Sequence, residues 1–330
     1  MTKLTVLGAG AWGTALAHSL AKANHDVTLW AFEKDVVDSV NHTQENTTYL
    51  KGIPLSANIT AMDDMQQAVE GAEAVLSVIP AQFSERLWQQ IKDLSVPLII
   101  CSKGIDVKSQ RFLSDIAADV FTDAPLATLS GPNFAAEIAK GLPAATTLAC
   151  ADEAIGEKLI GYFERTNLRP YLSDDIRGVE CAAAIKNVIA IACGVTVGCG
   201  MGDSARASVI TRGLAEATRF GAAFGAKTET FLGLSGAGDM TLTCNSLQSR
   251  NMSLGAELGK GKTLNDIMAE RSSVAEGVAT AKVVWKMAEE RNIPMPICQA
   301  VFAILYENHP VDDIVAALLS RPLRREQEVA

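Results

Sequence analysis

The chain has 330 residues, of which 48% are hydrophobic, and a formal net charge of -9 at pH 7. It is therefore long enough to bury a large core and exceeds one typical domain. The acidic balance argues against a general nucleic-acid surface, because binding phosphates needs clustered Lys and Arg. The 7 cysteines are scattered without a metal-ligand pattern, which predicts reduced, buried thiols in the cytoplasm and no metal site.

The N-terminal segment is an apolar strand that runs into the turn Gly8-Ala-Gly10-Ala-Trp-Gly13. Gly8 permits a tight turn, Gly10 lets the backbone approach a pyrophosphate, and Gly13 allows close helix-strand packing. A helical pattern at 14–23 offers free N–H groups to the anion, and a second strand follows at Asp26–Trp30. These features predict a dinucleotide site; the alternative is that the glycines only make a tight turn. With no signal segment before the strand, we expect a cytoplasmic protein.

Strand and helix patterns alternate along the first half of the chain. This predicts a Rossmann-like, doubly wound, mostly parallel sheet in residues 1–178, and the Ala-rich amphipathic pattern that follows predicts an all-helical domain in 179–330. An apolar stretch at 181–199 is interrupted by Lys186 and Asn187, so we expect a buried helix and no membrane span. Further strands are expected at 74–79, 97–101, 126–130 and 145–149, and helices at 63–70 and 84–94.

Two lysines stand in unusual sequence contexts. Lys103 follows the strand at 97–101, where ligands bind in such sheets, although a solvated loop lysine is the alternative. Lys186 lies in an apolar helix, where an ammonium must pair, reach solvent or lose its proton. Burial and a nearby positive charge such as Lys103 would lower its pKa, which makes Lys186 a candidate general acid and base. The alternative is a structural lysine paired with Glu180 or Asp239.

Two motifs in the second half suggest an anion site. The glycine-rich turn at 233–239 ends in Asp239, and Ser249-Arg250-Asn251 opens a helical segment. The guanidinium and the first-turn amides of that helix suit a phosphate. An ordinary N-cap followed by a surface arginine explains the same residues.

These motifs occur together in one known family. In order they are 8–17, 102–104, 130–132, 185–190, 210–214, 236–239, 249–251 and 274–277. Over essentially its full length the chain resembles bacterial NAD(P)-dependent glycerol-3-phosphate dehydrogenase. The resemblance implies reversible hydride transfer between NAD or NADP and C2 of glycerol 3-phosphate or dihydroxyacetone phosphate, for glycerophospholipid synthesis. We also expect a homodimer.

The resemblance also implies residue roles, with Lys186 as the proton donor and acceptor. The implied substrate-binding residues are Lys103, Gly131, Asn133, Lys186, Asp239, Ser249, Arg250 and Asn251. The implied cofactor-binding residues are Gly8, Gly10, Ala11, Trp12, Gly13, Phe32, Glu33, Lys103, Ala135, Arg250, Val274 and Glu276.

Some positions depart from the family pattern or leave alternatives open. The family often has Ser or Thr at the position of Asn133. It commonly has Ser at the position of Ala11, and alanine lacks the hydroxyl group that could donate a hydrogen bond to the pyrophosphate. Glu33 would accept from a ribose hydroxyl and favours NAD, whereas Lys34 would meet a 2′-phosphate, so the cofactor preference stays open. Arg250 suits a carboxylate equally well, which keeps a hydroxy-acid or ketopantoate-type dehydrogenase as an alternative. A non-catalytic dinucleotide sensor is the other.

Overall fold

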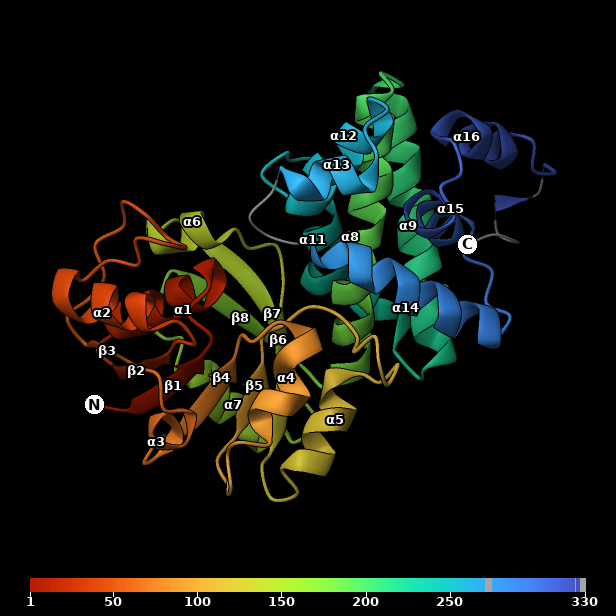
Figure 1. The fold of residues 1–330 in the computed structure, drawn as a ribbon. Coiled ribbons are helices and arrows are strands. Elements are labelled where there is room, and N and C mark those ends of the chain that lie inside the picture. Colours follow the sequence, from red (N-terminus) through yellow and green to blue (C-terminus); the bar gives the residue numbers. More distant parts are fainter. Residues whose placement is uncertain (271–274, 324, 327–330) are drawn as a thin grey trace. The chain divides into compact units, whose positions relative to one another are not determined.

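The computed structural model describes residues 1–270, 275–323 and 325–326. The chain forms two compact units, shown in Figure 1. One, called the sheet unit here, comprises residues 1–102 and 112–176; the other, the helical unit, comprises 103–111 and 177–330. The short segment 103–111 thus belongs by its contacts to the helical unit, whereas the sequence places it within a first domain of residues 1–178.

The sheet unit is built on an eight-stranded sheet with the order β3-β2-β1-β4-β5-β6-β7-β8. All neighbouring strands are parallel except β6 and β7, which are antiparallel. This confirms the predicted doubly wound, mostly parallel sheet, in which the strand order reverses on either side of β1. The strands are β1 (Lys3–Leu7), β2 (Asp26–Trp30), β3 (Ile59–Met62), β4 (Ala74–Ser77), β5 (Leu98–Ile100), β6 (Leu126–Ser130), β7 (Ala144–Cys150) and β8 (Leu168–Ser173).

Helices cover both faces of this sheet. On one face Leu16 of α1 lies in the same buried cluster as Val6 of β1. On the other, Trp88 of α4 and Ile116 of α5 share a cluster with Ile100 of β5. The helices are α1 (Ala11–Lys22), α2 (Lys34–Thr43), α3 (Met65–Val69), α4 (Ala81–Trp88), α5 (Leu113–Val120), α6 (Ala135–Ala139) and α7 (Glu153–Gly161).

Several element boundaries differ from the sequence prediction. The helix expected at 14–23 begins three residues earlier, because Gly10 is its N-cap and the glycine-rich segment itself forms the first turn. The helix expected at 84–94 spans Ala81–Trp88, directly after Pro80. The strand expected at 74–79 ends at Ser77.

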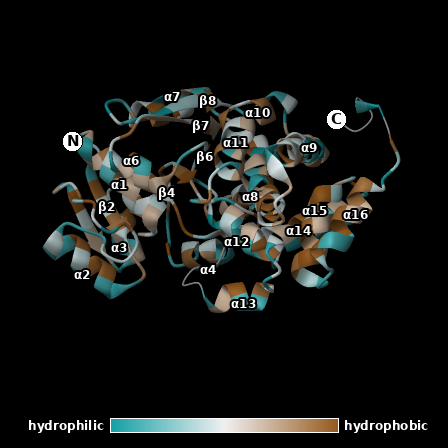
Figure 2. Ribbon diagram, turned by 90° about the horizontal axis from the view of Figure 1, so that it is seen from above, coloured by the Kyte–Doolittle hydropathy of each residue, from teal (hydrophilic) through white to brown (hydrophobic). Residues whose placement is uncertain are grey.

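The helical unit is centred on α8 (Ile176–Gly198), which has an apolar window with a mean hydropathy of 1.7. That window is long and apolar enough to cross a membrane, but 83% of it is buried within the protein, as predicted for a core helix. Figure 2 also colours much of α15 and α16 brown, in keeping with their apolar sequences. The other elements are α9 (Gly202–Ala223), α10 (Thr228–Leu232), the π-helix η1 (Leu234–Gly238), α11 (Asp239–Cys244), α12 (Arg250–Gly259), α13 (Leu264–Ala269), α14 (Glu276–Glu290), α15 (Pro296–Tyr306) and α16 (Val311–Leu319).

A glycine contact joins α8 to α12. A β-carbon on Gly194 would lie 2.1 Å from the carbonyl oxygen of Met252, and one on Gly255 would lie 2.0 Å from that of Ile191. The two backbones therefore touch without a side chain between them. The glycines of this contact are Gly194 and Gly198 on α8 and Gly255 and Gly259 on α12.

A buried carboxylate fastens α15 to α9. Glu216 of α9 is 1% exposed. Its two oxygens accept hydrogen bonds from the backbone N–H groups of Ile297 (2.7 Å) and Cys298 (3.1 Å), in the first turn of α15. Burial raises the pKa of Glu216 to about 7, although these hydrogen bonds favour the charged form. Cys298 itself is one of the 7 free cysteines, of which all but Cys199 are buried, as predicted.

Candidate active site

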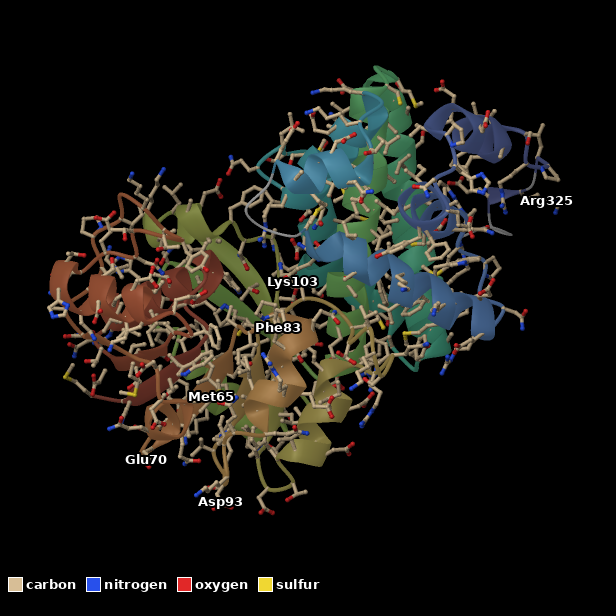
Figure 3. All side chains as sticks on the ribbon, viewed as in Figure 1. Met65, Glu70, Phe83, Asp93, Lys103 and Arg325 are labelled. Atoms are coloured by element: carbon tan, nitrogen blue, oxygen red, sulfur yellow. The ribbon has the colours of Figure 1, made fainter. Side chains whose placement is uncertain are left out.

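The helical unit brings two ammonium groups to one carboxylate. Lys186 of α8 donates from Nζ to Oδ1 of Asp239 at 2.6 Å and to Oγ1 of Thr243 at 2.9 Å. Lys103, labelled in Figure 3, donates from Nζ to the other carboxylate oxygen, Oδ2, at 2.8 Å. The structure thus brings together three residues expected at the site, and adds Thr243, which the sequence analysis missed.

The position of Asp239 depends on the π-helix η1. The sequence predicts a glycine-rich turn at 233–239, but the segment winds into one π-helical turn that leads directly into α11. A β-carbon on Gly236 would lie 2.1 Å from the carbonyl oxygen of Phe231, so a larger residue cannot occupy this position without displacing the backbone. Asp239 and Thr243 follow four residues apart, on one face of the helix. Thr243 Oγ1 also lies 3.2 Å from Oδ1 of Asp239.

Burial and charge set different pKa values within this cluster. Lys186 is 5% exposed and Asp239 is 1% exposed. Burial lowers the pKa of Lys186 to about 8; the attraction of Asp239 opposes this shift and the repulsion of Lys103 adds to it. For Lys103, burial acts in the same direction, but the carboxylate of Asp239 outweighs it and raises the pKa. For Asp239, the two ammonium groups outweigh the effect of burial and lower the pKa.

Lys186 is therefore the member of the cluster that can exchange a proton near neutral pH, while Lys103 and Asp239 stay charged. The structural alternative expected Lys186 to pair with Glu180 or Asp239, and such a pair is present. Asp239 pairs with Lys186, whereas Glu180 lies 3.4 Å from Arg177.

The start of α12 carries the expected Ser-Arg-Asn motif. Ser249 is the N-cap, and its side chain accepts a hydrogen bond from the backbone N–H of Met252 at 3.3 Å. Arg250 follows as an exposed residue in the first turn. Asn251 is buried and donates from Nδ2 to Oδ1 of Asn187 at 2.9 Å. The motif therefore does open a helix, with a capping serine and an exposed guanidinium.

Asn187 and Glu276 border the same group of residues. Among the described residues, Nδ2 of Asn187 is buried and has no hydrogen-bond partner. Glu276 is half-buried at the start of α14. Burial raises the pKa of its carboxyl group, and the positive charges of Arg250, Lys103 and Lys186 oppose that shift. The carboxyl group of Glu276 thus lies within electrostatic reach of all three cations.

The glycine-rich turn of the sheet unit fits a dinucleotide pyrophosphate. Gly8 has φ +113°, in the region that favours glycine, and a β-carbon on Gly13 would lie 1.8 Å from the carbonyl oxygen of Gly8. The N-cap of α1 is Gly10, and in the described part of the chain no atom lies within 4 Å of the place where its β-carbon would be. The first-turn N–H groups of α1 have no intrahelical acceptor. An anion can therefore approach them closely.

Other expected cofactor residues lie around the same unit. Ala11 is the first residue of α1, and the neighbouring Trp12 has a buried indole N–H without a partner among the described residues. Phe32 is 71% exposed after β2. Glu33 accepts a hydrogen bond from the hydroxyl group of Tyr49 at 2.8 Å. The remaining positions are Ala135, half-buried as the first residue of α6, and Val274, which lies outside the described residues.

Gly131 and Asn133 lie in the loop between β6 and α6. A β-carbon on Gly131, which is buried, would lie 2.7 Å from Cα of Thr146, so a larger residue would clash with β7. Asn133 donates from Nδ2 to the carbonyl oxygens of Pro132 (2.9 Å) and Ala145 (3.1 Å). The amide of Asn133 therefore holds this loop against β7.

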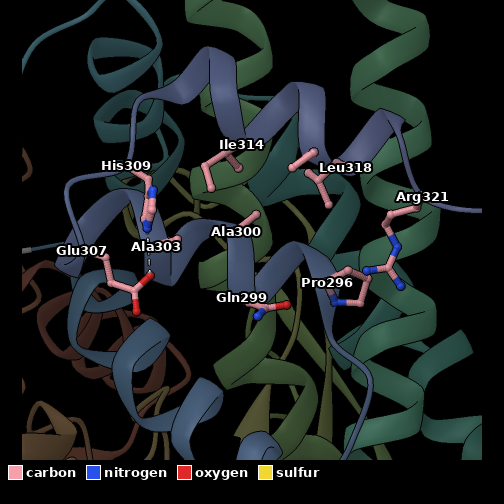
Figure 4. Close-up of a pocket in the computed structure, with 10 residues that line it drawn as sticks. Pro296, Gln299, Ala300, Ala303, Glu307, His309, Ile314, Leu318 and Arg321 are labelled. Carbon is pink, nitrogen blue, oxygen red and sulfur yellow. Dashed lines mark ion pairs between the residues drawn. The ribbon is translucent and has the colours of Figure 1, made fainter.

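A separate cavity of about 290 Å³ lies between α15 and α16 in the helical unit (Figure 4). Its polar lining includes Glu307 and His309, whose side chains approach to 3.5 Å. The cavity contains none of the residues expected at the site. The described residues also contain no group of three or more His, Cys, Asp or Glu side chains that could hold a metal ion.

Comparison with known proteins identifies the family. The family model for the NAD-dependent glycerol-3-phosphate dehydrogenase N-terminus matches residues 3–156, and the model for its C-terminus matches residues 175–316. The chain belongs to the NAD-dependent glycerol-3-phosphate dehydrogenase family. The C-terminal model begins at residue 175, close to residue 177, where the longer segment of the helical unit begins.

Individual family members match over nearly the whole chain. Glycerol-3-phosphate dehydrogenase (NAD(P)+) from Parvibaculum lavamentivorans is 50% identical over 98% of this chain and 98% of its own. The protein of the same name from Rhodospirillum rubrum is 49% identical over 98% of this chain and 93% of its own. The crystal structure of glycerol-3-phosphate dehydrogenase from Coxiella burnetii has a TM-score of 0.93 at 35% identity and covers 97% of this chain and 99% of that one.

Proposed function

We propose that the chain is an NAD(P)-dependent glycerol-3-phosphate dehydrogenase, which interconverts dihydroxyacetone phosphate and glycerol 3-phosphate. The observation that carries this proposal is the buried pair of Lys186 and Asp239, with the half-buried Lys103 bound to the other oxygen of the same carboxylate. Within this dehydrogenase family, such a cluster suits the reduction of a ketone, because negative charge develops on the carbonyl oxygen.

The proton chemistry belongs to Lys186. When bound, the nicotinamide supplies the hydride that adds to C2 of the ketone. The ammonium of Lys186 would give its proton to the C2 oxygen during ketone reduction, and its neutral amine would take a proton from the C2 hydroxyl group during alcohol oxidation. Lys103 keeps its charge because the pKa is raised, so it stabilises the negative oxygen throughout. Asp239 fixes both ammonium groups, with one carboxylate oxygen for each.

The phosphate ester is assigned to the start of α12. Ser249 is the N-cap of α12 and Arg250 is its first residue. The N–H groups of the first turn and the guanidinium of Arg250 are both donors that suit phosphate oxygens. Asn251 belongs to the same set of substrate residues. Gly131 and Asn133 of the sheet unit complete that set, as the family resemblance implies.

The cofactor is assigned to the glycine-rich turn of the sheet unit. Gly8, Gly10 and Gly13 would hold the pyrophosphate against the start of α1, and the unpartnered indole N–H of Trp12 is available as a further donor. Lys103 and Arg250 would contact both cofactor and substrate. The other proposed cofactor contacts are Ala11, Phe32, Glu33, Ala135, Val274 and Glu276.

The wider role follows from the product. Glycerol 3-phosphate is the backbone of glycerophospholipids, so we assign the enzyme to their synthesis in the cytoplasm. We also propose that it works as a homodimer. Sedimentation of the purified protein tests that state directly.

The proposed activity is tested by initial rates of NADH and, separately, NADPH oxidation with dihydroxyacetone phosphate. A non-phosphorylated ketoacid serves as the control substrate. We expect rapid turnover only with the phosphate ester, and the same assay ranks the two cofactors. Equal or faster turnover of the ketoacid would favour the hydroxy-acid or ketopantoate-type alternative, whereas cofactor binding without any turnover would favour a sensor.

A further inference from the structure

Three helices of the helical unit are joined through the side chain of Asn251. Its Oδ1 accepts a hydrogen bond from the backbone N–H of Gly277 at 2.9 Å, and its Nδ2 donates to Oδ1 of Asn187 at 2.9 Å. Asn187 lies on α8, Asn251 on α12 and Gly277 on α14. All three residues are buried. Both ends of the Asn251 amide are therefore engaged, and its orientation is fixed.

Asn251 accepts a hydrogen bond from a backbone N–H group at the start of α14. The N–H of Gly277 belongs to the first turn, which has no acceptor within its own helix. The N-cap of α14 is Ala275, whose methyl group cannot accept a hydrogen bond. Asn251 therefore supplies, from a different helix, the acceptor that a capping side chain normally provides.

Gly277 also packs closely against Asn187 and Asn251. A β-carbon at this position would lie 2.7 Å from the carbonyl oxygen of Asn187 and 2.7 Å from Oδ1 of Asn251. Even an alanine would push α14 away from α8 or displace the Asn251 amide. The close approach of the three helices at this point thus requires glycine.

Each of the three residues is the sequence neighbour of a residue at the proposed active site. Asn187 follows Lys186, Asn251 follows Arg250, and Gly277 follows Glu276. We propose that Asn251 and Gly277 are positioning residues that hold the carboxylate of Glu276 in place for the cofactor. Asn251 would then serve cofactor binding as well as substrate binding. This inference rests on the proposed contact between Glu276 and the cofactor.

A double-mutant cycle on NADH binding tests the proposal. The dissociation constant for NADH is measured by fluorescence, without substrate, for the wild type, Glu276→Ala, Asn251→Ala and the double variant. We expect each single variant to weaken binding about tenfold, and the double variant to bind no more weakly than Glu276→Ala, because the two residues act through one contact. Additive losses would overturn the inference.

The outcomes separate the inference from the proposed function. If Glu276→Ala binds NADH as well as the wild type, the cofactor role of Glu276 is wrong, and the inference fails with it. If Glu276→Ala weakens NADH binding but Asn251→Ala raises only the KM for dihydroxyacetone phosphate, the inference alone is overturned. Asn251 would then be a substrate residue only.

Two further variants control for a general loss of structure. Asn251→Asp keeps an acceptor for the N–H of Gly277 but loses the donor to Oδ1 of Asn187, so we expect NADH binding between that of the wild type and that of Asn251→Ala; binding weaker than in Asn251→Ala would contradict the proposal. Gly277→Ala is compared with Gly161→Ala, where no described atom lies within 4 Å of the added β-carbon. We expect only Gly277→Ala to weaken NADH binding, with circular dichroism and thermal melting as checks on folding.

Discussion

Replacing Lys186 by methionine should separate catalysis from stability. The change removes the ammonium but keeps a long, unbranched side chain in the buried site. Turnover should fall by about 100-fold to 10,000-fold, the usual contribution of a general acid and base. Asp239 keeps its contact with Lys103 at 2.8 Å, and a cluster with one excess positive charge becomes neutral. The free energy of unfolding should therefore fall by only about 1–2 kcal/mol, less than the ~3–5 kcal/mol expected when a buried charge loses its partner.

The matched variant is Asp239→Ala, which leaves the two ammonium groups of Lys186 and Lys103 without their shared counter-ion. Its free energy of unfolding should fall by about 3–5 kcal/mol. Steady-state NADH oxidation measures turnover, urea denaturation measures stability, and NADH fluorescence checks that Lys186→Met still binds the cofactor. If Lys186→Met turns over within tenfold of the wild-type rate, or is as unstable as Asp239→Ala, this account of the cluster is refuted.

Three further outcomes are expected. Lys186 has a pKa of about 8, so kcat/KM for ketone reduction should fall as the pH rises through that value, and kcat/KM for alcohol oxidation should rise; flat pH profiles in both directions would contradict its role. The pKa of Glu216 is raised from 4.5 to about 7, so its contribution to stability is present below pH 4.5 and is lost as the pH rises through 7, about 3 kcal/mol in all. Urea denaturation at several pH values should show a weaker pH dependence for Glu216→Gln than for the wild type. Gly13→Ala places a β-carbon 1.8 Å from the carbonyl oxygen of Gly8 and should abolish NADH binding, whereas Gly161→Ala should retain it.

The central strands of the sheet were predictable from sequence because they are buried on both faces and read as apolar runs. The two strands that the sequence analysis missed, β3 and β8, are the edges of the sheet. Edge strands keep one side exposed, so their apolar pattern is weak, and β8 contains Arg169 and Pro170. Proline is tolerated there because an edge strand leaves some N–H groups unpaired.

The parts of the site that could be predicted from sequence are those that a single residue or a short motif identifies. Lys186 stands out as a charge in an apolar helix, and the glycines of the first turn have a known spacing. The choice between Asp239 and Glu180 as its partner could not be made locally, because it depends on a π-helical turn 48 to 52 residues further along. Thr243 had one available signal, since it lies four residues after Asp239 on the same helical face.

The glycine contact between α8 and α12 imposes a one-sided constraint on the evolution of this enzyme. The helices already meet backbone to backbone at Gly194 and Gly255, so their separation is at its minimum. Most core contacts can tighten or loosen when a side chain changes size, but here every substitution adds volume and moves the helices apart. The separation of α8 and α12 at this contact can therefore grow but not shrink, so mutation at these four glycines can only loosen the packing beside the proposed active site.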